Sequence, residues 1–245
     1  MTRVRLLVAY DGTDFHGFAM NPAVRTVAGE LSALLARLVR HHVEVECAGR
    51  TDAGVHAWGQ VVAFHTTSDV DSQRLQRALI GQLAPEIVVR EVAVVDDTFD
   101  PRRHATSRAY RYTVRNAAVP DPFTDRYSWW VREPLDVAAM NAAAAHFVGE
   151  HDFASFCRRG PEGSTTVRRI LDAAWNQVDD VTLHFDIAGT AFCWQMVRSI
   201  VGTLVDVGRG KHRADEVPRM LTALDRNAAG AIAPPRGLCL RAVTY

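Results

Sequence analysis

The first half of the chain carries alternating strand-like and helix-like hydrophobic patterns. Residues 3 to 9 alternate apolar and polar positions and predict a strand that ends at an Asp-Gly turn signal. Apolar residues then recur at helical spacing from Val27 to His41, and Thr26 precedes them as an N-cap. VEVECA and QVVAF predict two further strands. The segment GRTDAGVHAWGQ, residues 49 to 60, therefore runs through a loop between strands, where scaffolds commonly hold chemistry.

The second half opens with a strand in which tyrosine and arginine alternate. Residues 109 to 115, AYRYTVR, place Tyr110 and Tyr112 on one face and Arg111 and Arg115 on the other. The same periodicities predict the remaining elements. These are helices at 72–83, 136–147, 192–207 and 214–224, and strands at 87–95, 167–178, 181–188 and 238–244.

This order of elements indicates an α+β fold. Each half mixes strands with one or two long helices, which favours mainly antiparallel sheets with helices packed on one face. We therefore expect a two-part α+β architecture. The predicted N-terminal domain, residues 1–105, carries the loop with Asp52, and the predicted C-terminal domain, residues 106–245, carries the tyrosine strand and the helix with Arg198.

The amino-acid composition limits the class of protein but does not identify a binding partner. Hydrophobic residues make up 48% of the 245 residues and charged residues 23%, which is typical of a globular protein. No apolar run approaches the roughly 20 residues that a bilayer span requires, so we expect a cytoplasmic protein. The four cysteines show neither a CxxC pair nor zinc-finger spacing and are expected to be reduced thiols.

Asp52 is the first candidate for chemistry. An aspartate before Ala-Gly is also a good turn residue, so on its own the structural interpretation is favoured. Gly49 and Gly54 allow close approach of the backbone, and Arg50 can supply charge-assisted hydrogen bonds. Together these features would hold a carboxylate in a defined place. His56 invites a metal interpretation with Asp52, but a metal site needs at least three protein ligands.

Arginine clusters are the second candidate. Between Phe99 and Arg115 the arginines are interleaved with two tyrosines, a mixture expected where bases stack on rings and phosphates meet guanidinium groups. A solvated charged surface is the alternative. The cluster consists of Arg102, Arg103, Arg108, Arg111 and Arg115, and further basic patches are Arg158, Arg159, Arg168, Arg169 and the run GRGKHR at 208 to 213.

Arg198 is the single charge in the helix FCWQMVRSIVGTLVDVG before Asp206. A lone arginine on an apolar helix is costly to desolvate unless it meets a carboxylate. Its side chain either reaches the surface or points into a cleft at Asp52, where a two-point pair would keep the aspartate ionised.

These stretches resemble the tRNA pseudouridine synthase A family. The resemblance rests on YDGTDFHGF, AGRTDAGVHAWGQVVAF, SRAYRY, FCWQMVRSIVGTLVDVG and GLCLRAVTY, which occur in this order over nearly the whole chain. It implies the pseudouridine synthase fold, with two α/β halves of mainly antiparallel sheets around a central cleft. It also implies isomerisation of uridine to pseudouridine at positions 38, 39 and 40 in the anticodon stem-loop of tRNAs, by a homodimer with no cofactor or metal. After GF the chain has AMNPAVRTV where many members have glutamines and an aromatic residue, so this loop bears on substrate selection.

The resemblance also implies roles for four residues. Asp52 matches the catalytic aspartate and Tyr110 the tyrosine that stacks on the target base. Arg198 matches the arginine paired to the aspartate, and Arg50 the arginine implicated in extruding the base. Asp52 can attack the sugar, attack C6 of uracil or remove the proton at C2', and the residues do not choose among these. A catalytically idle RNA-binding module and a metal-dependent hydrolase using Asp52 and His56 are the rival functions.

Overall fold

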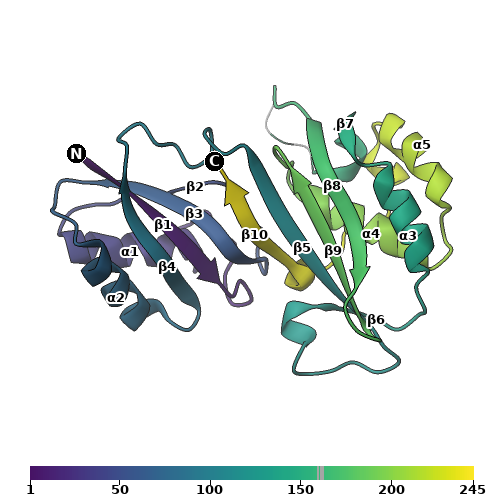
Figure 1. The fold of residues 1–245 in the computed structure, drawn as a ribbon, viewed down its shortest axis with the longest axis horizontal. Coiled ribbons are helices and arrows are strands. Elements are labelled where there is room, and N and C mark those ends of the chain that lie inside the picture. The colour runs from purple at the N-terminus through teal and green to yellow at the C-terminus, as the bar shows by residue number, and fades with distance from the viewer. Residues whose placement is uncertain (159, 161–162) are drawn as a thin grey trace. The chain divides into compact units, whose positions relative to one another are not determined.

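The computed structural model describes residues 1–158, 160 and 163–245. The chain divides into two compact units (Figure 1). The first unit is Met1–Thr106 together with Cys239–Tyr245, and the second is Ser107–Leu238. The predicted division places 239–245 in the second domain, whereas this segment is part of the first compact unit.

The first unit is an antiparallel sheet completed by one parallel strand. Its strands run in the order β4-β1-β3-β10, and β2 pairs with the outer part of β3. β10 joins β3 in parallel through Cys239–His56 and Leu240–Ala57. The elements are β1 (Thr2–Tyr10), α1 (Val27–Val39), β2 (Glu46–Cys47), β3 (His56–Thr66), α2 (Ser72–Leu83), β4 (Ile87–Val95) and β10 (Leu238–Thr244).

Alternation in β1 sets the core of this unit. Val4, Leu6 and Val8 have no exposed surface, and each pairs with a buried residue of β3. Helix α1 begins where Thr26 Oγ1 accepts a hydrogen bond from Gly29 N at 3.2 Å, and it ends at Arg40, which has φ of 62°. Figure 1 shows α1 behind the strands, where its apolar side is buried.

The second unit is a wholly antiparallel path of strands with one short parallel addition. The path is β5-β9-β8-β7, and β6 pairs in parallel with the end of β5. The elements are β5 (Ser107–Asn116), β6 (Trp129–Val131), α3 (Val137–Ala145), β7 (Gly149–Asp152), β8 (Val167–Gln177), β9 (Thr182–Gly189), α4 (Met196–Gly208) and α5 (Val217–Thr222).

Helix α4 forms the core of the second unit. Every residue of α4 except Arg198 is buried. Gly202 allows this close packing, because a Cβ there would lie 1.7 Å from the carbonyl oxygen of Ala231. None of the helices within the described residues is both long and apolar enough to cross a membrane.

The predicted class, α+β with mainly antiparallel sheets, is confirmed. Several boundaries differ from the prediction, two of them as follows. The helix expected at 192–207 begins only at Met196, because Gln195 before it has φ of 63°, a left-handed conformation that interrupts a helix. The strand expected from VEVECA pairs only at Glu46–Cys47, and residues 43 to 45 before it are not in a strand.

Candidate active site

Asp52 is the first residue of a tight turn. Val55 N donates a hydrogen bond to Asp52 O at 3.1 Å and closes the turn. Gly54 has φ of 76° at the third position, where a turn of this kind needs the positive φ that glycine adopts without strain. The Asp52 side chain is half-buried, and that of Arg50 is exposed. The turn therefore presents the carboxylate at a fixed point of the backbone.

The segment from Gly12 to Phe18 packs directly on this turn. A Cβ at Gly12 would lie 2.0 Å from Val55 O, and one at Gly17, which has φ of 91°, would lie 2.8 Å from Thr51 O. Phe18 N donates to Thr51 O at 3.1 Å. Glycine is thus needed at both positions for the two backbone segments to touch. The motifs YDGTDFHGF and GRTDAGVHA therefore pack against each other.

His56 is bonded to the same segment. Gly12 N donates to His56 Nδ1 at 3.0 Å, and Asp11 Oδ1 lies 3.2 Å from that nitrogen. Because Nδ1 accepts a hydrogen bond, the neutral ring carries its proton on Nε2. In the described part of the chain, no three His, Cys, Asp or Glu side chains come together in a way that would hold a metal ion.

Tyr110 and Tyr112 share a face of β5, as the alternation predicts, but they differ in exposure. Tyr112 is fully buried and donates from its hydroxyl to Pro234 O at 2.8 Å. Burial raises the pKa of Tyr112 far above its usual range, and the nearby charges of Arg198 and Arg236 offset a smaller part of that rise. Tyr110 is half-buried, and its ring meets the Phe192 ring edge-on with centroids 5.1 Å apart. Only Tyr110 offers ring surface to a ligand.

Arg198 is held by the backbone of the second unit. Its Nε donates to Ala233 O at 2.8 Å, and Ala233 N donates back to Arg198 O at 3.0 Å. The first bond restrains the guanidinium group, and the second joins the backbone of α4 to the segment that contains Ala233. Asp52 lies in the first unit and Arg198 in the second. Each residue is described within its own unit, so the pairing of the two side chains stays a prediction.

The arginine cluster from 102 to 115 divides into two kinds. Three of its members have partners inside the second unit. Arg111 makes a two-point pair with Asp186 at 2.7 and 2.9 Å, Arg108 Nη1 donates to Thr190 O at 2.7 Å, and Arg115 Nη1 donates to Thr182 Oγ1 at 2.5 Å. Arg102 and Arg103 are exposed in the first unit. More of these arginines therefore stabilise the second unit than the sequence pattern indicates.

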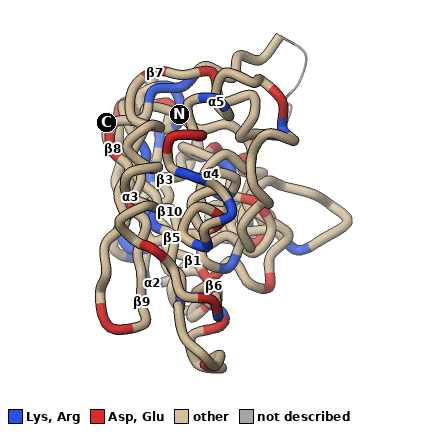
Figure 2. Tube along the Cα trace, turned by 90° about the vertical axis from the view of Figure 1, so that its right-hand side faces the viewer, with Lys and Arg blue, Asp and Glu red and all other residues tan. Residues whose placement is uncertain are grey.

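The basic run at 208 to 213 has acidic partners. Arg209 Nη2 lies 3.0 Å from Glu133 Oε2, and Lys211 Nζ lies 2.9 Å from Asp206 Oδ1. Figure 2, which looks onto the side of the second unit, shows acidic and basic positions interspersed along the trace. Arg159 lies outside the described residues.

The sequence pattern does not predict three buried polar side chains beside the turn, those of Tyr10, Thr51 and Gln60. Tyr10 is 4% exposed, Thr51 7% and Gln60 0%. The only signal in the sequence is a glutamine at the start of the apolar run QVVAF, which alone does not distinguish a buried residue from a strand end.

Comparison with known proteins gives one consistent set of relatives. A family model described as tRNA pseudouridine synthase matches residues 6–102 and 143–245. The tRNA pseudouridine synthase A of Brevibacillus brevis is 43% identical over 245 residues, 100% of both chains. That of Halalkalibacterium halodurans is 45% identical over 240 residues, covering 97% of this chain and 90% of the relative. The solved archaeal box H/ACA Nop10-Cbf5 complex matches at 13% identity and a TM-score of 0.36, covering 96% and 46%, and adds nothing to this set.

Proposed function

Because the chain belongs to the tRNA pseudouridine synthase family, we propose that it isomerises uridine to pseudouridine at positions 38, 39 and 40 in the anticodon stem-loop of tRNAs. One observation carries the proposal. The family match includes the Asp52 turn, and two segments of the first unit are packed so closely there that glycine is required. Such packing holds one carboxylate in place.

The reaction defines what the protein must supply. The bond between C1' and N1 breaks, the uracil turns, and C1' joins C5; C5 then loses its proton to water and N1 takes up a proton. Nothing is oxidised and no group leaves, so the residues need to provide a nucleophile or base, a surface that holds the detached uracil, and exclusion of water. Asp52 is the nucleophile or base in this proposal, acting at the sugar, at C6 or at C2'.

The other three residues act around this carboxylate. Tyr110 stacks on the uracil while it turns, consistent with its half-buried ring beside Phe192. Arg198 keeps Asp52 ionised through a two-point pair. Arg50, exposed two residues before Asp52, helps to hold the nucleotide out of the helix, which costs a few kcal/mol of stacking and pairing.

The proposal extends to partners and location. The substrate is tRNA, the working form is a homodimer in the cytoplasm, and no metal or cofactor takes part. Exposed arginines such as Arg102 and Arg103 contact phosphates, so tRNA affinity falls steeply as salt rises.

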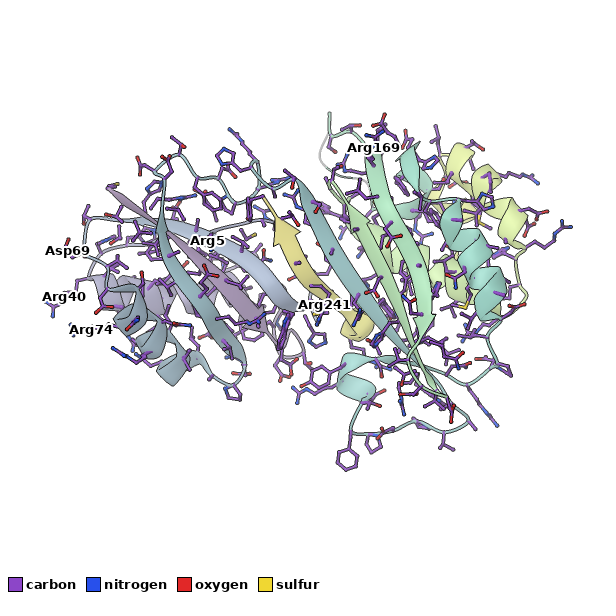
Figure 3. All side chains as sticks on the ribbon, viewed as in Figure 1. Arg5, Arg40, Asp69, Arg74, Arg169 and Arg241 are labelled. Atoms are coloured by element: carbon purple, nitrogen blue, oxygen red, sulfur yellow. The ribbon has the colours of Figure 1, made fainter. Side chains whose placement is uncertain are left out.

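Release of tritium from C5-labelled uridine in tRNA tests the function. The enzyme should release tritium, whereas an idle RNA-binding module would bind the tRNA without release. Asp52→Asn should abolish release while tRNA affinity stays near that of the parent. Asp69→Asn is the matched control, since Asp69 is an exposed carboxylate of the same unit (Figure 3), and it should turn over normally. Appreciable release by Asp52→Asn would remove Asp52 from the chemistry.

A second measurement addresses the hydrolase alternative. A metal-dependent enzyme would lose turnover in excess chelator. We expect full turnover under those conditions, and a loss that added divalent metal restores would contradict the proposed mechanism.

A further inference from the structure

Three polar side chains lie buried under the Asp52 turn. They are Tyr10, Thr51 and Gln60, and all belong to the first unit. The hydroxyl groups of Tyr10 and Thr51 share a hydrogen bond of 2.7 Å. Gln60 Nε2 donates to Gly49 O at 2.7 Å and lies 3.4 Å from the Tyr10 hydroxyl oxygen. Their hydrogen bonds therefore hold Gly49 and Thr51, the two residues on either side of Arg50, just before Asp52.

Strand geometry brings these groups together. Tyr10 ends β1, and Gln60 lies on the neighbouring strand β3. The register between the two strands shifts, from Val8 opposite Gln60 to Tyr10 opposite Ala57. A shift of this kind bends the strand and re-aims the side chain that follows it. Here it coincides with the Tyr10 hydroxyl meeting Thr51.

Stability alone does not account for a glutamine at this position. Gln60 has no exposed surface, and its Oε1 has no hydrogen-bond partner among the described residues. A buried acceptor without a partner destabilises a fold, and an apolar side chain of similar volume would avoid that cost. What the amide contributes instead is a directed bond to Gly49 O, three residues before Asp52. That bond constrains where the turn begins.

We propose that Tyr10 and Gln60 are positioning residues that set the orientation of the Asp52 carboxylate, acting through Thr51 and Gly49. The inference rests on the proposed function, in which Asp52 is the catalytic group. Neither Tyr10 nor Gln60 is assigned a contact with the substrate. Their effect is geometric, because a catalytic group displaced by about 1 Å can lose on the order of 100-fold in rate.

A double-mutant cycle on the Tyr10–Thr51 bond tests this. Tyr10→Phe and Thr51→Val each remove one hydroxyl and break the same bond. Each should lower the single-turnover rate at saturating enzyme by about tenfold, while tRNA affinity stays within about twofold of the parent. The double variant should be no slower than the slower single variant. Thr51→Ser keeps the hydroxyl and should restore most of the rate.

A control variant, a further test variant and a stability measurement separate the outcomes. Tyr245→Phe also removes a hydroxyl hydrogen bond of the first unit, the 2.9 Å bond to Pro101 O, and should leave the rate unchanged. Gln60→Met keeps volume while removing the bond to Gly49 and should slow turnover like Tyr10→Phe. Thermal unfolding of all variants shows whether a lower rate merely follows a lower melting temperature.

Asp52→Asn is assayed in parallel so that two failures can be told apart. If Asp52→Asn still turns over, the proposed catalytic role fails. If Asp52→Asn is inactive but Tyr10→Phe and Gln60→Met react at the parent rate, only the positioning role is overturned. It is also overturned if the two hydroxyl deletions slow the reaction additively, or if rate, tRNA affinity and melting temperature fall together, as a general structural defect would cause.

Discussion

Gly12 lies against Val55 so closely that a Cβ at Gly12 would be 2.0 Å from the Val55 carbonyl oxygen. The contact joins the end of β1 to the turn that begins at Asp52, and Gly12 N also donates to His56 Nδ1. Two segments separated by about forty residues are thus locked by a position where any side chain would force the backbone apart.

Gly12→Ala should therefore disable the site more than it destabilises the protein. The backbone must shift by more than 1 Å to admit the methyl group, so we expect tritium release to fall by about 100-fold or more. Gly81→Ala is the matched control, because a Cβ at Gly81 in α2 would meet nothing within 4 Å. It should keep full activity and raise the free energy of unfolding by roughly 0.5 to 1 kcal/mol. A Gly12→Ala enzyme with the parent rate would contradict the role of this contact.

Tyr112 should make the second unit sensitive to alkali. Its pKa is raised by burial when folded, whereas an unfolded tyrosine titrates near pH 10. Above about pH 10 the unfolded chain loses this proton and the folded chain keeps it, so the stabilisation present below pH 10 is lost as pH rises, by about 1.4 kcal/mol per pH unit.

Tyr112→Phe isolates that contribution. The variant should lose about 1 kcal/mol of unfolding free energy at neutral pH, from the lost bond to Pro234, and its stability should fall less steeply between pH 10 and 11. Urea unfolding at several pH values measures both effects. Equal slopes for the two proteins would show that Tyr112 ionises as readily folded as unfolded.

Arg198→Lys should lower turnover more than tRNA binding. An ammonium group cannot make the two-point pair with a carboxylate that a guanidinium makes, and it also loses the Nε bond to Ala233 O. Single-turnover rate and tRNA affinity, measured on the same preparations, separate the two effects. Unchanged turnover would remove Arg198 from the site.

Cys193 should be an unusually reactive thiol. A hydrogen bond from Cys157 lowers the pKa of Cys193 to about 7, while the same interaction and burial raise the pKa of Cys157. Because the thiolate is the nucleophile, alkylation of Cys193 by iodoacetamide should rise with a midpoint near pH 7, and Cys157 should stay unlabelled in the folded protein.

Cys157→Ala provides the control for this reactivity. Without the neighbouring thiol, the midpoint for Cys193 should move up toward the value of about 8.5 found for free cysteine. Peptide mapping after timed alkylation at each pH gives the midpoint. A midpoint that the substitution does not move would rule out the thiol pair as the cause.

Local patterns predicted most of the fold. Alternation in residues 109 to 115 placed Tyr110 and Tyr112 on one face, and the caps at Thr26 and Asp136 marked the starts of their helices. The pairing of β10 with β3 was not predictable in this way, since it joins residues about 180 positions apart and periodicity contains no information on partners.

The candidate site was only partly predictable for the same reason. The motif around Asp52 identified the loop, but nothing local indicated that Gly12 and His56 would be bonded to each other or that Tyr10 would meet Thr51. Likewise, the sequence left the arginine run open between a nucleic-acid surface and a solvated charged surface, and it did not indicate that Asp186 would pair with Arg111 from another strand.

The return of Cys239–Tyr245 to the first unit bears on how the protein is made. Met1–Thr106 emerges from the ribosome long before Cys239–Tyr245. The sheet that supports Asp52 therefore stays incomplete, with one side of β3 lacking its partner β10, until the whole second unit has been synthesised. Completion of the sheet beside the Asp52 turn is thus expected only after residues 239–245 have been synthesised, and a nascent chain stalled before residue 239 should hold the first unit in an incomplete, protease-sensitive state.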